Sequence, residues 1–402
     1  MRPAFPVRLG AAEETLIAQL KAAGADQVAE RVTVAGLPTR RVEAYHYTDL
    51  KTLLRTVPPL AQPANEATGT AIRVPGAYAL SIVNGVVQHA ATAPEGVIVG
   101  KTHGGVLTHR DDTLVGISNG LTKEALSLDL RGTIDQVIQI DHRIEGEAGH
   151  VADATKIFVA DDSSVVILET FSGSDAAHVG NHASYLALGK NAIVTHVTVD
   201  LGSRATAHFA TNEYHLAEGA QLRTLVVHAG SGLARTHLFP RMEGAGAHAD
   251  VTGLNLVSEG QHSDITMETT HAVPHTSSQP LFKSITRGRS KAVVQGKLIV
   301  ARDAQKTDAK FMHQGLMLSD DAEILSKPEL EIYADDVVCG HGSTCGKLDE
   351  DSLFYLLSRG IPKAEAETML VRGFIAELID PIEDEALNEA LQGIVDGWLL
   401  GQ

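Results

Sequence analysis

The chain has 402 residues, of which 44% are hydrophobic and 21% are charged, which is typical of a globular protein with a sizeable core. Its formal net charge of -17 argues against nucleic-acid binding, because a phosphate backbone requires clustered lysine and arginine. Aromatic residues make up only 4%, and there are 37 glycines, so the composition favours a β architecture with many turns.

The N-terminal stretch from Met1 to Leu16 has no long apolar segment and does not resemble a secretory signal. No run of apolar residues approaches the length that crosses a bilayer. The only cysteines are Cys339 and Cys345, too few and too close together for a disulfide-stabilised secreted protein. We therefore expect a cytoplasmic protein with reduced thiols and no membrane partner.

The first hundred residues mix helix, loop and short strands, and we take residues 1–100 as an N-terminal helical or mixed region. Apolar residues at helical spacing predict a helix over Glu13–Ala29. A proline-containing stretch, Val57–Ala64, follows the segment Tyr45–Leu54 and is typical of a linker.

From about Arg131 to Val338 the apolar pattern has a period of two, interrupted only by turn residues. A recurring unit of polar turn, small residue and strand aligns at spacings of 28, 28 and 27 residues, on Ser164, Ala192, Ala220 and Ala247. A near-fixed period with strand content indicates a β-helix, because a β-sandwich has no reason to keep one. We expect the β-helix core to span residues 101–345.

Residues 346–402 are predicted to form a C-terminal helical domain. One helix should end at Gly360, placed where a helix C′ glycine belongs, before Ile361-Pro362. A second helix is expected over Lys363–Ile379, and Pro381 opens a third amphipathic segment. We expect these helices to cap the last coil, whose strand edges would otherwise be exposed.

The chain lacks the sequence motifs of several enzyme classes. The chain has no Gly-x-x-x-x-Gly-Lys-Ser/Thr phosphate loop, no dinucleotide fingerprint and no Gly-x-Ser-x-Gly elbow. Four Asp-Asp pairs, beginning at Asp111, Asp161, Asp320 and Asp335, would suit a β-helix carbohydrate-active enzyme that uses paired carboxylates. Turns favour aspartate too, so these pairs have an ordinary structural explanation.

The 19 histidines are mostly scattered along the predicted strands, where a single histidine is usually a structural residue. His271 and His275 have a ligand spacing for a helix, but Pro274 between them disfavours one. The densest group of soft ligands runs from Cys339 through His341 to Cys345. Two thiols and one imidazole do not complete a metal or cluster site, so a second chain would have to supply ligands; the alternative is a turn with buried cysteines.

The region around these cysteines resembles the SufB/SufD family of iron–sulfur cluster assembly proteins. The resemblance covers essentially the whole chain and is carried by Lys327–Gly342, Leu348–Asp351, Phe354–Leu356, Ser358–Ile361, His271, Ser277–Ser278, Phe282–Lys283, Gly296–Val300, Gly36–Pro38, Arg41, Glu43 and Tyr47–Thr48. SufB-type members carry more cysteines, and this chain has none before Cys339, which favours the SufD branch.

The resemblance implies a right-handed parallel β-helix that pairs with SufB, and C-terminal helices that dock the ATPase SufC. It implies a non-catalytic scaffold with no stably bound cofactor, at whose interface with SufB a nascent iron–sulfur cluster is built. His341 and Cys339 match the family positions near that interface, whereas Cys345 departs from the family pattern and receives no role. The expected partner-binding residues are Leu348, Phe354, Tyr355, Arg359, Gly360 and Phe374.

Other functions stay open beside the scaffold. One is the β-helix carbohydrate-active enzyme, and another is a purely structural partner in which His341 is only a turn residue. In isolation the chain could also form a homodimer in place of the pair with SufB.

Overall fold

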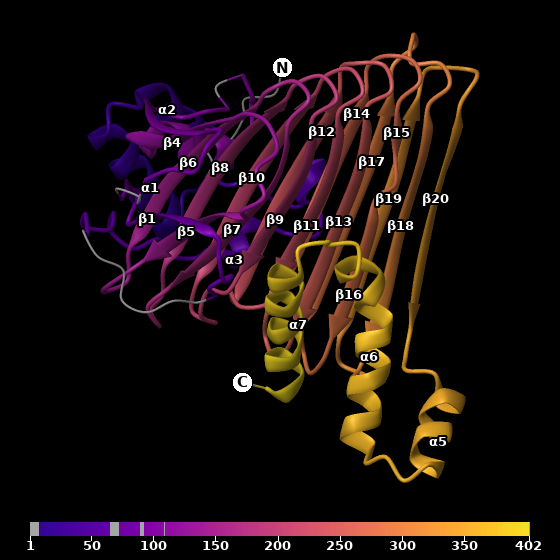
Figure 1. Cartoon of the computed structure of the whole chain (residues 1–402). Helices are drawn as coiled ribbons and strands as arrows, with labels where there is room; N and C mark the ends of the chain where they lie inside the picture. The colour runs from indigo at the N-terminus through magenta and orange to yellow at the C-terminus, as the bar shows by residue number, and fades with distance from the viewer. Residues whose placement is uncertain (1–7, 65–71, 89–91, 108, 402) are drawn as a thin grey trace.

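The computed structural model describes residues 8–64, 72–88, 92–107 and 109–401. Residues 1–7, part of the stretch searched for a signal segment, lie outside this range. The described chain forms a parallel β-solenoid of about eight turns, with helices at both ends of the sequence (Figure 1). The predicted all-β core with terminal helical regions is thus confirmed.

Each coil of the solenoid contributes one strand to each of two sheets. The nine-stranded sheet has the order β19 (Glu323–Ile332), β17 (Lys291–Val300), β14 (His262–His271), β12 (Leu233–Met242), β10 (Ala207–Leu216), β8 (Val179–Leu188), β6 (His150–Val159), β4 (Glu124–Leu130) and β3 (Val97–His103). The eleven-stranded sheet has the order β15 (Ser277–Ser278), β18 (Asp308–Met317), β16 (Leu281–Thr286), β13 (His248–Val257), β11 (Gln221–His228), β9 (Ile193–Asp200), β7 (Ser164–Gly173), β5 (Ile138–Ile144), β1 (Tyr78–Val83) and β2 (Val86–Val87), and β20 (Val338–Gly346) pairs with β18. Apolar side chains of both sheets meet in one buried core between them.

The repeat that the sequence indicated corresponds to the coil, with one correction. Ala192, Ala220 and Ala247 each precede a strand of the eleven-stranded sheet and are fully buried, where stacked coils leave room only for a small side chain. The strand register pairs Ser164 with Ile193, so Ser163 and not Ser164 occupies the position equivalent to Ala192. The alignment on Ser164 was wrong by one residue because the turns between coils differ in length.

The N-terminal helices pack on the nine-stranded sheet. They are α1 (Ala11–Ala22), α2 (Asp26–Ala35), the 3-10 helix η1 (Glu43–Tyr45), α3 (Leu50–Leu53) and α4 (Thr113–Leu121). The single helix expected over Glu13–Ala29 is two helices, because Gly24 has a φ of 77° and breaks the helical path. Their apolar side chains form a cluster with residues of β8, β10 and β12.

The segment Val57–Ala64, expected to be a linker, is held against the solenoid. The Pro58 carbonyl accepts a 2.8 Å hydrogen bond from the side chain of Gln19, and Leu60 forms a parallel β-bridge with His150. Strands β1 and β3 also begin before residue 101, where we expected the core to start. The division into three domains stays a prediction.

The C-terminal helices α5 (Glu350–Ser358), α6 (Lys363–Ile379) and α7 (Glu385–Leu400) have the predicted positions in the chain. Gly360 has the positive φ, 85°, of a helix C′ glycine. The expectation that these helices cap the last coil is wrong. Figure 1 shows α6 and α7 in front of the eleven-stranded sheet, and their apolar side chains form one cluster with residues of β9, β11, β13 and β16. The eleven-stranded sheet also has apolar residues on its outer face. Because α6 and α7 cover these residues, they lie on the face of the sheet and not at the end of the stack of coils.

Candidate functional site

The final coil of the solenoid is open. Strand β20 pairs only with β18, so its other edge has no strand partner among the described residues. Its first residue, Val338, is 60% exposed, and Tyr333 in the preceding turn is equally exposed. An unpaired strand edge beside exposed apolar side chains can add a strand from another chain.

The three candidate ligands of the sequence lie on this edge strand. Because side chains alternate along a strand, Cys339, His341 and Cys345 share one face of β20. His341 and Cys345 are exposed, and Cys339 is half-buried against the core. Cys339 and Cys345 are six residues apart, about 20 Å along a strand, so they cannot bind one ion together. Cys339 and His341, two residues apart, can.

The thiols of this face are not activated by their surroundings. Burial raises the pKa of the Cys339 thiol, and Asp308 nearby adds to the effect. Burial also raises the pKa of Cys345. Both thiols are therefore mostly protonated at neutral pH, and a metal or a basic group would have to displace the proton.

The six expected partner-binding residues divide into two groups. The first group is at α5: Phe354 and Tyr355 are 72% and 55% exposed, and the guanidinium of Arg359 lies 5.0 Å from the Tyr355 ring centroid. Gly360 follows Arg359 directly and belongs to the same group. Leu348 and Phe374 instead pack against the cluster between the C-terminal helices and the sheet. Only the α5 group is exposed on the surface of this chain.

The pair His271 and His275 is not a ligand pair. The two ring nitrogens of His271 are hydrogen-bonded to the hydroxyl groups of Thr276 and Ser278, at 2.8 Å and 3.0 Å. His275 is exposed in the following turn, with a φ of 59°.

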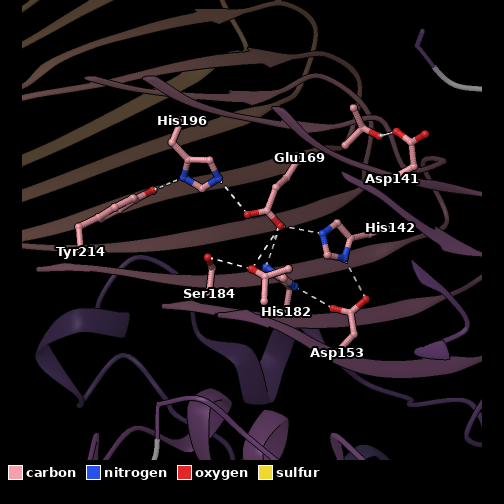
Figure 2. Close-up of polar contacts among 10 residues, drawn as sticks. Asp141, His142, Asp153, Glu169, His182, Ser184, His196 and Tyr214 are labelled. Carbon is pink, nitrogen blue, oxygen red and sulfur yellow. Dashed lines mark hydrogen bonds and ion pairs between the residues drawn. The ribbon is translucent and has the colours of Figure 1, made fainter. Parts of the chain in front are cut away.

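Sequence reasoning missed a group of buried charged side chains inside the N-terminal half of the solenoid (Figure 2). It consists of His142, Asp153, Glu169, His182 and His196, which come from five consecutive strands, β5 to β9. We call it the buried histidine–carboxylate cluster. Glu169 lies at its centre: one carboxylate oxygen is 2.7 Å from Nε2 of His142, and the other is 2.9 Å from Nε2 of His196.

Asp153 orients two of these rings. The Nδ1–H group of His182 donates to one oxygen of Asp153 at 2.8 Å, and that of His142 donates to the other at 3.1 Å. The opposite nitrogens, Nε2 of His142 and of His182, then face the same oxygen of Glu169, at 2.7 Å and 3.3 Å. The contact with His182 lacks hydrogen-bond geometry, so Nε2 of His182 has no hydrogen-bond partner.

The cluster holds its charges despite burial. Desolvation alone would lower the pKa of His142, but the carboxylates of Asp153 and Glu169 outweigh it and raise the pKa to about 10. Desolvation would likewise raise the pKa of Glu169, but His182 and the other two histidines hold it well below its usual value. The sequence carried one sign of this arrangement: His142, Glu169 and His196 follow one another at intervals of 27 residues, close to the length of one coil.

Comparison with known proteins identifies a family for the chain. Residues 142–374 match the family described as "SUF system FeS cluster assembly, SufBD core domain". The iron-sulfur cluster assembly protein SufD of Escherichia coli is 27% identical over 393 residues, which cover 91% of this chain and 90% of the relative. An iron-sulfur cluster assembly SufBD family protein of Synechocystis is 30% identical, over 60% of this chain and 55% of the relative. One of Mycobacterium bovis is 31% identical, over 65% of this chain and 60% of the relative.

The protein is thus a parallel β-solenoid whose final coil has an unpaired strand edge and whose helices pack on both sheets. The chain belongs to the SufBD core family of iron–sulfur cluster assembly proteins, as its resemblance predicted. Within the described part of the chain, no helix is long and apolar enough to cross a membrane.

Proposed function

We propose that the chain is a non-catalytic, SufD-like scaffold subunit, which pairs with SufB through the last coil of its solenoid and docks the ATPase SufC through its C-terminal helices. The observation that carries the proposal is the open edge of β20, on which His341 and Cys339 lie side by side. The nascent iron–sulfur cluster is the cargo of this interface, and SufB supplies the remaining ligands.

Pairing through β20 follows from its unsatisfied backbone groups. Buried backbone N–H and C=O groups are almost always paired, so a partner strand added to β20 gains a ladder of hydrogen bonds. A SufB coil stacked there would also cover Val338 and Tyr333, both 60% exposed. The same pairing would shield Cys339 and His341 from water.

Docking of SufC is assigned to α5, which has no buried residue in this chain. Phe354 and Tyr355 would serve as aromatic anchors, a role in which such side chains are enriched at interfaces. The C-terminal region is acidic, with twelve Asp and Glu against three Lys and Arg after Lys347, which favours a basic surface on the partner.

The first test is co-purification of the chain with SufB and SufC from the same source. Deleting everything after Leu348 would uncover the apolar sheet face beneath α6 and α7, so substitutions in α5 are sharper. Phe354→Ser together with Tyr355→Ser should weaken SufC binding at least tenfold and leave SufB bound. Val34→Ser, on the exposed face of α2 at 68% exposure, is the matched control and should change neither. Failure of the unaltered chain to bind either partner would refute the scaffold function.

The ligand role needs its own variant. His341→Ala should leave the complex assembled and lower the rate of cluster formation, and Cys339→Ser should lower it less. His103→Ala, an exposed histidine on β3 at the opposite end of the nine-stranded sheet, is the control. Normal cluster assembly by His341→Ala would mean that the chain is a purely structural partner.

The carbohydrate-active alternative gains no support from the Asp-Asp pairs. All four lie in turns or at a helix cap: Asp112, for example, caps α4 by accepting from the Leu114 N–H at 2.8 Å. Asp320 is paired with Lys347 at 2.6 Å, and Asp336 with Lys306. These contacts give the aspartates structural roles.

A further inference from the structure

We propose that the buried histidine–carboxylate cluster is a binding site for one divalent first-row transition-metal ion, with His142, His182 and Glu169 as its protein ligands. This site lies inside the solenoid, several coils from β20, and needs no partner chain. It is therefore distinct from the proposed cluster interface.

Convergence of the ligand atoms is the first observation. One nitrogen of each histidine and one oxygen of Glu169 lie within 4.8 Å of one another, and all three side chains are buried. Two imidazoles and one carboxylate are the ligand set of many zinc and non-haem iron(II) sites. The three residues come from β5, β7 and β8, so both sheets contribute and the rigid solenoid fixes their spacing.

Orientation of the two rings is the second observation. Histidines that bind a metal usually donate the other ring N–H to a carboxylate, which fixes the tautomer and aims the free nitrogen. Asp153 does this for both rings at once, at 2.8 Å and 3.1 Å. The His142 ring is also stacked on Phe171, with centroids 4.5 Å apart. Both Nε2 atoms are thereby held toward Glu169, and binding of the ion would release to solvent the Nε2 proton that His142 donates to Glu169.

The unpartnered nitrogen is the third observation. Nε2 of His182 is buried and makes no hydrogen bond, and its contact with the Glu169 oxygen is a longer one of 3.3 Å, so a bound ion would remove the cost of the missing hydrogen bond. A cavity of about 30 Å³ adjoins the cluster and is lined by His142, Asp153, His182 and His208 among others. That volume accommodates about one water molecule, the usual further ligand at an open metal site.

The test uses the full-length chain with Co²⁺ as the spectroscopic probe. The protein is stripped with chelator and refolded from denaturant with Co²⁺ present, so that the ion can reach the buried site. We expect one Co²⁺ per chain, with visible d–d absorption bands and an X-ray absorption spectrum that shows two imidazole ligands. Because this spectrum is taken on the unaltered chain, its result does not depend on the folding of any variant.

Substitutions then assign the ligands. His182→Gln and Glu169→Gln should each abolish the bands, and Asp153→Asn should raise the dissociation constant 10- to 100-fold by releasing the rings. His271→Gln, a buried histidine bound only to hydroxyl groups, is the matched control and should bind Co²⁺ normally. The double variant Cys339→Ser/His341→Ala should also bind Co²⁺ normally, a result that would exclude the Cys339–His341 pair on β20 as the site.

Two results would overturn the proposal. Absence of stoichiometric Co²⁺ in the refolded, unaltered chain would show that the cluster is only a buried ion-pair network. Bands that persist in refolded His182→Gln and disappear in the Cys339/His341 double variant would place the ion on β20 instead.

Discussion

The ammonium group of Lys283 donates a 2.7 Å hydrogen bond to the backbone carbonyl of Phe374, and this contact joins strand β16 to helix α6. The side chain of Lys283 is 4% exposed, and its Nζ atom lies 4.8 Å from the centroid of the Phe374 ring. A buried cation on the outer face of the sheet thus holds α6 through a carbonyl, an aromatic ring and the Glu377 carboxylate, which accepts from Nζ at 2.8 Å.

Replacing this lysine should loosen the C-terminal helices. Lys283→Met keeps the length of the side chain and removes the charged hydrogen bonds to the Phe374 carbonyl and to Glu377, of which the one to the carbonyl contributes about 1.5–3 kcal/mol in proteins. We expect a loss of that size in the free energy of unfolding, measured by urea denaturation. Lys291→Met is the matched control, because Lys291 pairs with Glu323 at a more exposed position and should cost under about 1 kcal/mol. Equal losses in the two variants would contradict this assignment.

A second buried cation anchors the N-terminal region. Arg235 on β12 pairs with Asp264 on β14, donates to the Ala44 carbonyl at 2.7 Å and lies 4.3 Å from the Tyr45 ring centroid. Arg235→Met leaves the buried Asp264 carboxylate without its cationic partner, although the hydroxyl groups of Thr48 and Thr266 still donate to it. We expect this variant to cost about 3–5 kcal/mol in thermal or chemical unfolding. Adding Asp264→Leu should recover much of that loss, and a double variant less stable than Arg235→Met would refute the explanation.

Stability should also fall in mild acid because several histidines are buried in the neutral form. Burial lowers the pKa of His271 to about 4, whereas an unfolded histidine titrates near 6.5. Below pH 6.5 the unfolded state takes up a proton that the folded state does not, so stability is lost as the pH falls toward 4. His271 contributes up to about 3 kcal/mol of this loss. Unfolding curves of His271→Gln between pH 7 and pH 4.5 should show a shallower decline than the unaltered chain; parallel declines would contradict the assignment.

Close packing between coils leaves no room for a Cβ atom at Gly296. A Cβ atom on Gly296 in β17 would overlap the ring of Phe311 from β18. Gly296→Ala should therefore destabilise the chain by about 1–3 kcal/mol through overpacking. Gly393→Ala in α7 is the control, because a Cβ there meets open space and should add up to about 1 kcal/mol of helix stability. Differential scanning calorimetry would separate the two, and a neutral Gly296→Ala would show that the ring can move aside.

The solenoid could be predicted because its pattern is local. Each coil repeats a turn, a small residue and a strand, and Ala192, Ala220 and Ala247 marked that repeat correctly. The shift at Ser164 arose from a turn of different length, which strand patterning does not constrain. The resemblance placed Cys339 and His341 near a partner interface, but nothing in the sequence indicated that both lie on one strand with an unpaired edge.

The predicted helical cap was misplaced and the buried cluster was missed because both depend on contacts between residues far apart in the sequence. The sequence of an amphipathic helix shows which of its faces is apolar but not which surface that face covers. The apolar run Leu225–Val227 in β11 was the available sign that the eleven-stranded sheet is buried on both faces. The cluster was missed because each histidine was judged alone along its strand. In a solenoid, residues 27–29 positions apart become neighbours, as Asp153 and His182 do.

The position of α6 and α7 has a mechanical consequence. The helices follow all the strands in the sequence, yet they contact strands far earlier in it: Arg223 donates to the Pro381 carbonyl, and Arg287 to that of Trp398. A force applied at the C-terminus would have to peel these helices from several coils before β20 could be pulled from β18. Helices α6 and α7 therefore brace several coils of the solenoid against unwinding, while they leave the free edge of β20 without a strand partner among the described residues.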